Sequence, residues 1–438
     1  MGLVFPEMKR VTVSKRTTAP VKKQSLWARL GPGLITGAAD DDPSGIATYS
    51  QVGAGFGYGI LWTAFFTFPL MVGIQTVSAR IGRVTGYGLA ANLRRYYPPW
   101  LLYGIVVLLL IANTINIAAD IGAMGAALQL LIGGSAHWYS IAFGIISVVL
   151  EVVVPFPRYS PILKVLTLAL LAYVATVFIV KVPWGVVFYQ TVLPTLSLKA
   201  DYVVAVVAVF GTTISPYLFF WQASQEVEEL RGAPDEKPLL KAPAQAKVQL
   251  LRIKIDTYFG MAFSNIVAFF IMLTAAVTLH LQGITDIQTA TQAAQALRPL
   301  AGDFAFALFA AGIVGTGLLA VPVLAGSAAY AVAEAFKWRI GLRLQFLQAS
   351  GFYMIVIIAT ILGVALNFTS INPIKALFWS AVINCVVAVP IMVVMMLMAM
   401  RADIMGTFVI SRRLKVLGWL ATGTMAIVVI AMFVTWGQ

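Results

Sequence analysis

The sequence is dominated by long apolar runs, each able to cross a lipid bilayer as a helix. A run of about 18 or more mostly apolar residues marks a spanning helix. Of the 438 residues, 60% are hydrophobic and only 11% are charged, whereas soluble domains carry about a quarter charged residues. The sequence therefore predicts an all-α integral membrane protein of about eleven transmembrane helices in contact with lipid. The predicted spans are 33–56, 59–81, 101–131, 138–156, 161–180, 203–223, 256–279, 303–333, 350–367, 375–400 and 415–436.

The basic residues predict the orientation, because cytoplasmic loops collect Lys and Arg. With the N-terminus inside, only Lys181, Lys199, Arg298 and Lys375 of the 30 Lys and Arg residues lie outside. This bias explains the net charge of +13, so the charge does not indicate a protein that binds nucleic acid. Residues 1–30 are expected to form a basic cytoplasmic tail, since no apolar signal core directly follows them. No eukaryotic targeting signal is found, so we expect the plasma membrane of a bacterium.

The spans divide into two blocks of five around a charged, proline-containing connection at about 224–255, which we expect to be a solvated linker. An odd number of spans per block makes the second block enter the membrane in the opposite direction, the inverted-repeat arrangement of many secondary transporters. Within a transporter domain of residues 31–438, we place the first repeat at 31–200, the second at 201–400 and an additional helix at 401–438.

The first and sixth spans carry helix breakers at the same position in each block. The first reads Asp40-Asp41-Asp42-Pro43-Ser44-Gly45 and the sixth reads Gly211-Thr212-Thr213-Ile214-Ser215-Pro216-Tyr217. Proline cannot donate to the carbonyl four residues back, so Pro43 frees the carbonyl of Ala39 and Pro216 frees that of Thr212. A lone proline kink is usually architectural, but matched interruptions in two repeats point to a binding site near the midplane.

Three consecutive carboxylates inside an apolar run favour a functional site, because each costs at least about 2.5 kcal/mol there. Successive helical residues point about 100° apart, so the three cannot all face one ion. Asp42, next to the break, is the expected ligand. Asp40 and Asp41 are expected either in an aqueous vestibule or paired with a basic residue. Carboxylate, hydroxyl and carbonyl oxygens suit hard cations, Na⁺ included.

Other chemistries lack the residues that they need. Cys385 is the single cysteine, and His137 and His280 lie away from both breaks, so neither a disulfide nor a zinc site of several His or Cys ligands is expected. An intramembrane hydrolase would need a catalytic group with a partner base, and no His-Glu-x-x-His is present. A receptor or scaffold does not explain paired broken helices. We therefore expect a transporter, not an enzyme, without a cofactor and acting as a monomer.

At these residues the sequence resembles the NRAMP family of divalent metal transporters. The first break with Gly31-Pro32-Gly33-Leu34 resembles the family's Asp-Pro-Gly-Asn signature, and 211–217 resembles its Ala-Thr-Val-Met-Pro-His motif preceded by Gly. Further similarity lies at 158–164 and 255–257, and the likeness runs from about Gly31 to Trp436. It implies a broken-helix, inverted-repeat fold of the LeuT type with an eleventh helix, and a metal site between the first and sixth spans. Asp42 matches the family's metal-binding Asp, and the Thr212 carbonyl matches a backbone ligand.

The sequence departs from the family pattern at several of its functional positions. Gly45 stands for the family's Asn ligand, Ser215 for its Met and Tyr217 for its His. A Gln of the tenth span is Ala381, with Asn384 one turn further along. In the third span Ile117 and Asp120 stand where the family carries an Asp and a Glu for proton movement. Thr213, Tyr217, Asp120, Asn384 and Asp41 are therefore candidates for cavity or relay residues, and Asp42, Thr212, Gly45, Ser215 and Ala39 for the metal site.

The departures predict a change of cargo. A thioether favours Mn²⁺ and Fe²⁺ over Mg²⁺, so its replacement by Ser215 predicts a wider site lined by oxygen. Mg²⁺ keeps several waters and uses one or two carboxylates, so such a site fits it. The pattern of replaced residues resembles the magnesium branch of the family. We expect import of Mg²⁺, with Mn²⁺ also accepted, weakly coupled or uncoupled to protons. Asp120 and Glu151 remain possible proton carriers, or else form interhelical hydrogen bonds or ion pairs. The alternatives are a proton-coupled Mn²⁺/Fe²⁺ importer and a Na⁺-coupled carrier of small solutes.

Overall fold

The computed structural model describes residues 32–154, 158, 168–369 and 371–436, and the predicted tail 1–30 lies outside them. Within the described residues all regular structure is helical, as predicted. Eight helices there are long and apolar enough to cross a membrane, with the two halves of the sixth span counted as one. The first span, made of α2 and α3, and the shorter apolar helices α9 and α17 complete the eleven.

The observed helices follow the predicted spans closely, except at the fifth span, the end of the sixth and the start of the seventh. The third and eighth spans are α6 and α16, each one continuous helix. The fifth is described only from residue 168 onward. In chain order the spans are α2 (Pro32–Asp40) with α3 (Pro43–Phe56), α4 (Trp62–Thr85), α6 (Pro99–Ile132), α7 (Ala136–Val153), α9 (Leu171–Ile179), α11 (Ala200–Thr213) with α12 (Pro216–Gly232), α13 (Ala246–Thr278), α16 (Ala305–Ala335), α17 (Ser350–Leu366), α18 (Pro373–Met400) and α20 (Arg412–Thr435).

The solvated linker predicted at 224–255 is wrong in extent, and its first residues are buried rather than solvated. α12 continues to Gly232 and α13 already begins at Ala246, so only the short stretch between them connects the two helices. Glu226, expected in water, is fully buried. The charges that indicated solvent instead pair with one another between helices, which lets them enter the protein.

These charges form an ion-pair cluster made of Arg83, Glu226, Glu229, Glu236 and Arg252. Arg83 of α4 pairs with Glu236 and lies 3.9 Å from Glu226 of α12. Arg252 of α13 pairs with Glu226 and, at 3.0 Å, with Glu229. The side chains of Arg83 and Glu226 have no exposed surface. The cluster therefore ties α4, α12 and α13 together near one end of the bundle.

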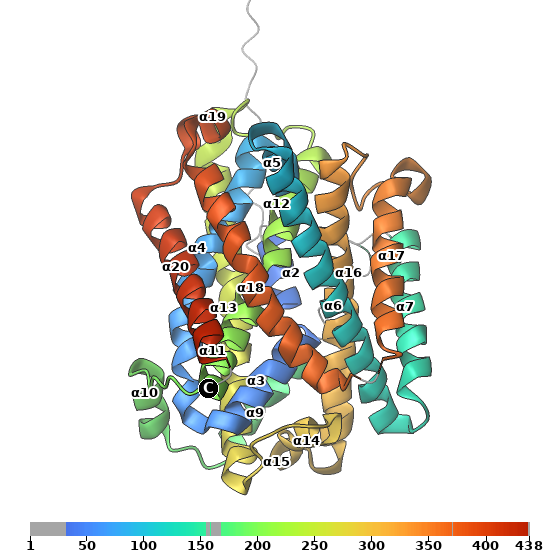
Figure 1. Cartoon of the computed structure of the whole chain (residues 1–438), viewed down its shortest axis with the longest axis vertical. Coiled ribbons are helices and arrows are strands. Elements are labelled where there is room, and N and C mark those ends of the chain that lie inside the picture. Colours follow the sequence, from blue (N-terminus) through green and yellow to red (C-terminus); the bar gives the residue numbers. More distant parts are fainter. Residues whose placement is uncertain (1–31, 155–157, 159–167, 370, 437–438) are drawn as a thin grey trace, which may run out of the picture.

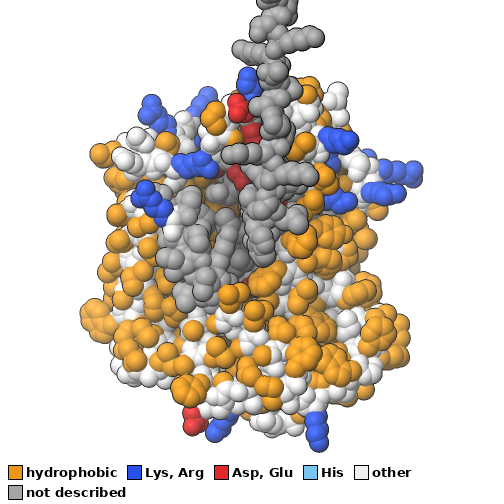
Figure 2. All heavy atoms as spheres, turned by 180° about the vertical axis from the view of Figure 1, so that it is seen from behind, with side chains coloured by type: hydrophobic (Ala, Val, Ile, Leu, Met, Phe, Trp, Pro, Cys, Tyr) orange, Lys and Arg blue, Asp and Glu red, His pale blue; other side chains and the backbone are white. Residues whose placement is uncertain are grey.

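The spans form one bundle, with short helices at its two ends (Figure 1). α5 (Leu89–Tyr96) and α19 (Ala402–Met405) lie at the upper end in that view, and α10 (Trp184–Val192), α14 (Ala290–Gln295) and α15 (Arg298–Ala301) at the lower end. α6 and α18 run in opposite directions across the middle. Seen from behind, Lys and Arg side chains gather around the upper end while hydrophobic side chains cover the flanks (Figure 2). This pattern is that of a protein embedded in a bilayer.

Two glycines let the broken helices approach their neighbours with backbone in contact. A Cβ at Gly37 of α2 would lie 2.2 Å from the carbonyl oxygen of Gly260 in α13. A Cβ at Gly211 of α11 would lie 1.9 Å from the carbonyl oxygen of Ala381 in α18. Any side chain at these positions would push backbone away, so both glycines hold the broken spans tightly against neighbouring helices.

Candidate cation site at the two helix breaks

Both predicted breaks are present in the structure. α2 ends at Asp40 and α3 begins at Pro43, while α11 ends at Thr213 and α12 begins at Pro216. Each break therefore brings a helix C-terminus with free carbonyls next to a helix N-terminus with free N–H groups. The carbonyl ends carry partial negative charge that favours cations.

Asp42 lies between α2 and α3 as the N-cap of α3. Its Oδ1 accepts a hydrogen bond from the Gly45 N–H at 2.7 Å. Its Oδ2 accepts from the Tyr217 hydroxyl at 3.3 Å, which links the first break to the second. The residue is only 2% exposed. Asp42 thus both fixes the start of α3 and presents a carboxylate to the sixth span.

The carbonyls of Ala39 and Thr212, which the prolines were expected to free, both accept hydrogen bonds from hydroxyl groups. The Tyr217 hydroxyl also lies 3.0 Å from the Ala39 carbonyl, so its single proton is shared with Asp42. The Ser215 hydroxyl donates to the Thr212 carbonyl at 2.8 Å and lies equally close to that of Gly211. Both predicted backbone ligands therefore accept hydrogen bonds, one from the sixth span to the first and one within the second break.

Gly45 faces the sixth span. A Cβ added there would lie 3.3 Å from Thr212 Oγ1 and 3.4 Å from the ring of Tyr49. The space left by the missing side chain is thus occupied by these two neighbours in this conformation. Thr213 turns to Tyr49, with its hydroxyl 3.1 Å from the Tyr49 hydroxyl, and donates to the carbonyl of Val209 at 2.7 Å.

Asp40 and Asp41 lie neither in a vestibule nor, among the described residues, in an ion pair. They are 0% and 1% exposed, and both contact one hydroxyl of α13. Ser264 Oγ lies 2.5 Å from Asp40 Oδ2 and 3.2 Å from Asp41 Oδ1. The other oxygen of each carboxylate has no hydrogen-bond partner in the described part of the chain. One serine hydroxyl of the seventh span, which has a single proton to donate, therefore stands where a basic residue was expected.

Asn384 and Asp120 differ in how their polar groups are satisfied. Asn384 of α18 exchanges side-chain hydrogen bonds with Asn116 of α6, at 2.8 and 3.3 Å. Asp120 is fully buried, and neither of its carboxylate oxygens has a hydrogen-bond partner among the described residues. Glu151 of α7 is likewise buried without such a partner in that part of the structure. Ile117 is buried and apolar.

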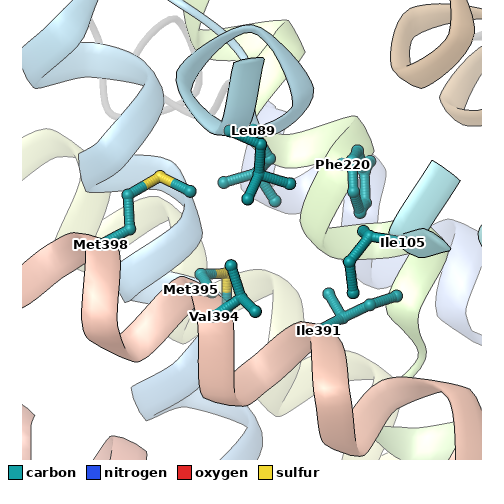
Figure 3. Close-up of a pocket in the computed structure, with 8 residues that line it drawn as sticks. Leu89, Ile105, Phe220, Ile391, Val394, Met395 and Met398 are labelled. Atoms are coloured by element: carbon teal, nitrogen blue, oxygen red, sulfur yellow. The ribbon is translucent and has the colours of Figure 1, made fainter. Parts of the chain in front are cut away.

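The candidate residues are all buried, so the structure is closed around both breaks. A separate crevice opens between α5, α6, α12 and α18, but its lining is apolar throughout (Figure 3). Leu89, Phe220, Ile391, Met395 and Met398 are among its side chains. Such a lining offers no oxygen ligand, so the breaks are the better place for a cation.

Sequence reasoning did not single out Tyr49, Ser264 and Ser380, all of which contact site residues. Ser380 of α18 lies 3.4 Å from Ser44 through their hydroxyl oxygens. A hydroxyl in an apolar run is a weak signal, because it commonly bonds to its own helix. Ser264 and Ser380 lie far from both breaks along the chain, and Tyr49, seven residues after Asp42, belongs to no recognisable motif.

The comparisons with known proteins agree with this architecture. A sequence model of the Nramp family, described as natural resistance-associated macrophage protein-like, matches residues 33–435. The divalent metal cation transporter MntH of Deinococcus radiodurans is 25% identical over 424 residues, which cover 95% of this chain and 91% of the relative. MntH of Klebsiella pneumoniae is 26% identical over 402 residues, 90% of each chain.

Solved structures show the same fold at lower identity. A manganese transporter of Eremococcus coleocola is 17% identical with a TM-score of 0.72, covering 98% of this chain and 90% of that structure. A nucleobase-cation-symport-1 family transporter reaches a TM-score of 0.55 at 12% identity, covering 93% and 92%. The predicted fold, with two inverted repeats and broken first and sixth helices of the LeuT type, is confirmed.

The family model covers almost the whole chain, and the chain therefore belongs to the Nramp family. The resemblance inferred from the two break motifs is confirmed, and so is the assignment to transport rather than enzyme catalysis.

Proposed function

We propose that this protein imports divalent metal cations, most readily Mg²⁺ and also Mn²⁺, by alternating access. The observation that carries the proposal is the donor set at the breaks. Asp42 joins the first break to the sixth span, and every candidate ligand beside it offers oxygen. The names of the relatives, two divalent metal cation transporters and a manganese transporter, support a divalent cargo. The metal is cargo here, and no cofactor is involved.

The preference for Mg²⁺ rests on Ser215. A thioether at this position would select softer ions, whereas a roomy site lined by oxygen fits a partly hydrated Mg²⁺. Mn²⁺ is also accepted, because it takes the same ligands. Weak or absent proton coupling rests on Tyr217 and Ile117, since a phenol keeps its proton near neutral pH and Ile cannot carry one. Inward movement of a double charge is favoured by about 4.6 kcal/mol per 100 mV, which can drive uptake without protons.

The proposal includes the orientation of the protein in the membrane, its oligomeric state and the bounds of its repeats. The basic end seen in Figure 2 faces the cytoplasm, with the N-terminus inside, in a bacterial plasma membrane. The functional unit is a monomer, because α2, α3, α6, α11, α12 and α18 of one chain supply all the candidate residues. The inverted repeats are 31–200 and 201–400, followed by the additional helix at 401–438.

The test is uptake of Mg²⁺ and Mn²⁺ into proteoliposomes that contain a pH-sensitive dye. We expect both ions to enter without acidifying the lumen. Mn²⁺ entry accompanied by protons, with Mg²⁺ neither entering nor competing, would instead establish a proton-coupled Mn²⁺ importer. The relatives, MntH and a manganese transporter, make this the second candidate.

Restoring sulfur at the sixth-span break is expected to change selectivity. In Ser215→Met, a thioether replaces the hydroxyl that bonds to the Thr212 carbonyl, so soft cations gain a ligand. We expect Cd²⁺ to inhibit Mg²⁺ uptake at concentrations at least about 10-fold lower than in the parent protein. Ser350→Met, at the exposed start of α17, is the control and should leave inhibition unchanged. Equal Cd²⁺ sensitivity in both variants would remove position 215 from the selecting site.

A further inference from the structure

Asp120 of α6 is a buried carboxylate that the structure leaves without a hydrogen bond. The residue has no exposed surface, and neither of its oxygens has a hydrogen-bond partner among the described residues. No basic side chain in that part of the chain forms an ion pair with it. An ionised carboxylate in such a place needs a compensating cation. The surroundings of Asp120 decide which cation that is.

Packing between α6 and α18 fixes where Asp120 lies. The two helices run in opposite directions, and Asn116 and Asn384 exchange hydrogen bonds between them (Figure 1). One turn further along α6 comes Asp120, and one turn back along α18 comes Ser380. Residues one turn apart lie on the same helix face. Asp120 and Ser380 therefore lie on the contacting faces of α6 and α18, one helical turn from the Asn116–Asn384 pair.

This part of the contact between α6 and α18 lies beside the first break. The Ser380 hydroxyl lies 3.4 Å from the hydroxyl of Ser44, two residues after Asp42. Asp42 and Asp120 are near enough for their charges to interact, and both are near the Tyr217 hydroxyl. Both residues are buried, with exposures of 2% and 0%. The two carboxylates therefore lie near each other inside the protein, beside the first break.

We propose that Asp120 is the second carboxylate of the cation site and binds the ion through its bound water. This proposal rests on the proposed function and names one more residue of that site. Mg²⁺ is held in proteins by one or two carboxylates while it keeps several waters. A divalent cation between Asp42 and Asp120 neutralises both charges, which two fixed carboxylates cannot do for each other.

The alternative role, a proton relay, has no continuation along α6. The next polar side chains on the same face are Asn116 and Asn113. Asn116 is bonded to Asn384, and Asn113 donates to the Leu324 carbonyl and to Ser327 at 2.9 and 2.7 Å. Carboxamides do not titrate, so a proton on Asp120 finds no acceptor further along this face.

Calorimetric binding of Mg²⁺ to the purified full-length protein, at fixed pH in detergent, separates the two roles. We expect Asp120→Asn, which keeps the shape and removes the charge, to raise the Kd for Mg²⁺ at least about 10-fold, the loss typical of removing a group that supports a bound metal. Asp120→Glu restores the charge and should recover most of the affinity. Asp303→Asn, at an exposed acidic position outside the site, is the charge-matched control and should bind as the parent does.

Each outcome decides the proposal. A relay role would leave the Kd of Asp120→Asn unchanged and would alter only proton movement in the dye assay, which would overturn the assignment. Loss of Mg²⁺ binding in Asp42→Asn alongside normal binding in Asp120→Asn would also overturn it, while the proposed function would stand. Should the parent protein bind neither Mg²⁺ nor Mn²⁺, the proposed function itself would fall. If Asp120→Asn does not elute as a folded monomer, the decision rests on Asp120→Glu. The longer side chain displaces the carboxylate, so an unchanged ratio of Mg²⁺ to Mn²⁺ affinity in that variant counts against the proposal.

Discussion

Asp42→Asn is expected to abolish Mg²⁺ and Mn²⁺ uptake while the protein still folds. Asn caps a helix about as well as Asp does, so the hydrogen bond from the Gly45 N–H to position 42 is kept. What disappears is the negative charge beside the Tyr217 hydroxyl, which also bonds to the Ala39 carbonyl. Removing a supporting group of a metal site costs 10–100-fold in affinity, so losing the direct carboxylate should cost at least about 100-fold. Calorimetry and proteoliposome uptake both measure this loss.

The matched control is a helix cap away from the site. Ser411 caps α20 by accepting from the Leu414 N–H, and Ser411→Ala removes this bond. The loss is expected to cost about 1 kcal/mol of stability without changing the Kd for metal. Should Asp42→Asn transport Mg²⁺ as the parent does, the break between α2 and α3 would not hold the ion, and the site would have to be sought elsewhere.

Arg83→Met is expected to produce the largest loss of stability. Arg83 is fully buried and balances the carboxylates of Glu226 and Glu236. Methionine fills similar volume but leaves Arg252 as the remaining cation of the ion-pair cluster. Breaking a buried ion pair costs about 3–5 kcal/mol, and because Arg252 remains we expect about 3 kcal/mol. Thermal unfolding followed by tryptophan fluorescence should show a fall of several degrees in the midpoint.

Arg401→Met tests whether burial is the cause. Arg401 forms a comparably close ion pair with Asp403, but both side chains are exposed, at 42% and 52%. Exposed pairs contribute little because water screens them, so the unfolding midpoint should remain that of the parent. Equal effects of the two substitutions would show that the ion-pair cluster does not hold α4, α12 and α13 together.

The broken helices were predictable because their causes are local. Pro43 and Pro216 each remove one backbone donor, and the effect reaches only one turn back. The N-cap role of Asp42 follows from its position directly before Pro43. By contrast, Ser264 meets Asp40 across 224 positions of sequence, and only the packing of α2 against α13 through Gly37 brings them together. No periodicity in the sequence carries such information.

The misplaced linker shows how composition misleads when charges are paired. A stretch rich in Glu, Arg and Lys predicts solvent, because isolated charges cannot be buried. Here Glu226 is buried, since Arg252 follows it from the next helix and Arg83 approaches from another. The sequence shows each charge but not its partner. A predicted solvated segment therefore needs a search for counter-charges on other helices before helix ends are assigned.

The hydroxyls of Tyr217 and Ser215 compete with the transported ion for the same carbonyl oxygens. A cation that takes the carbonyls of Ala39 and Thr212 as ligands competes with both hydroxyls for the lone pairs of these oxygens. The affinity of the site is lowered by whatever those two hydrogen bonds contribute, and the same groups return when the ion departs. Tight binding is a handicap for a carrier, since turnover is limited by release as much as by capture. Tyr217 and Ser215 therefore favour a moderate affinity and rapid release of the ion.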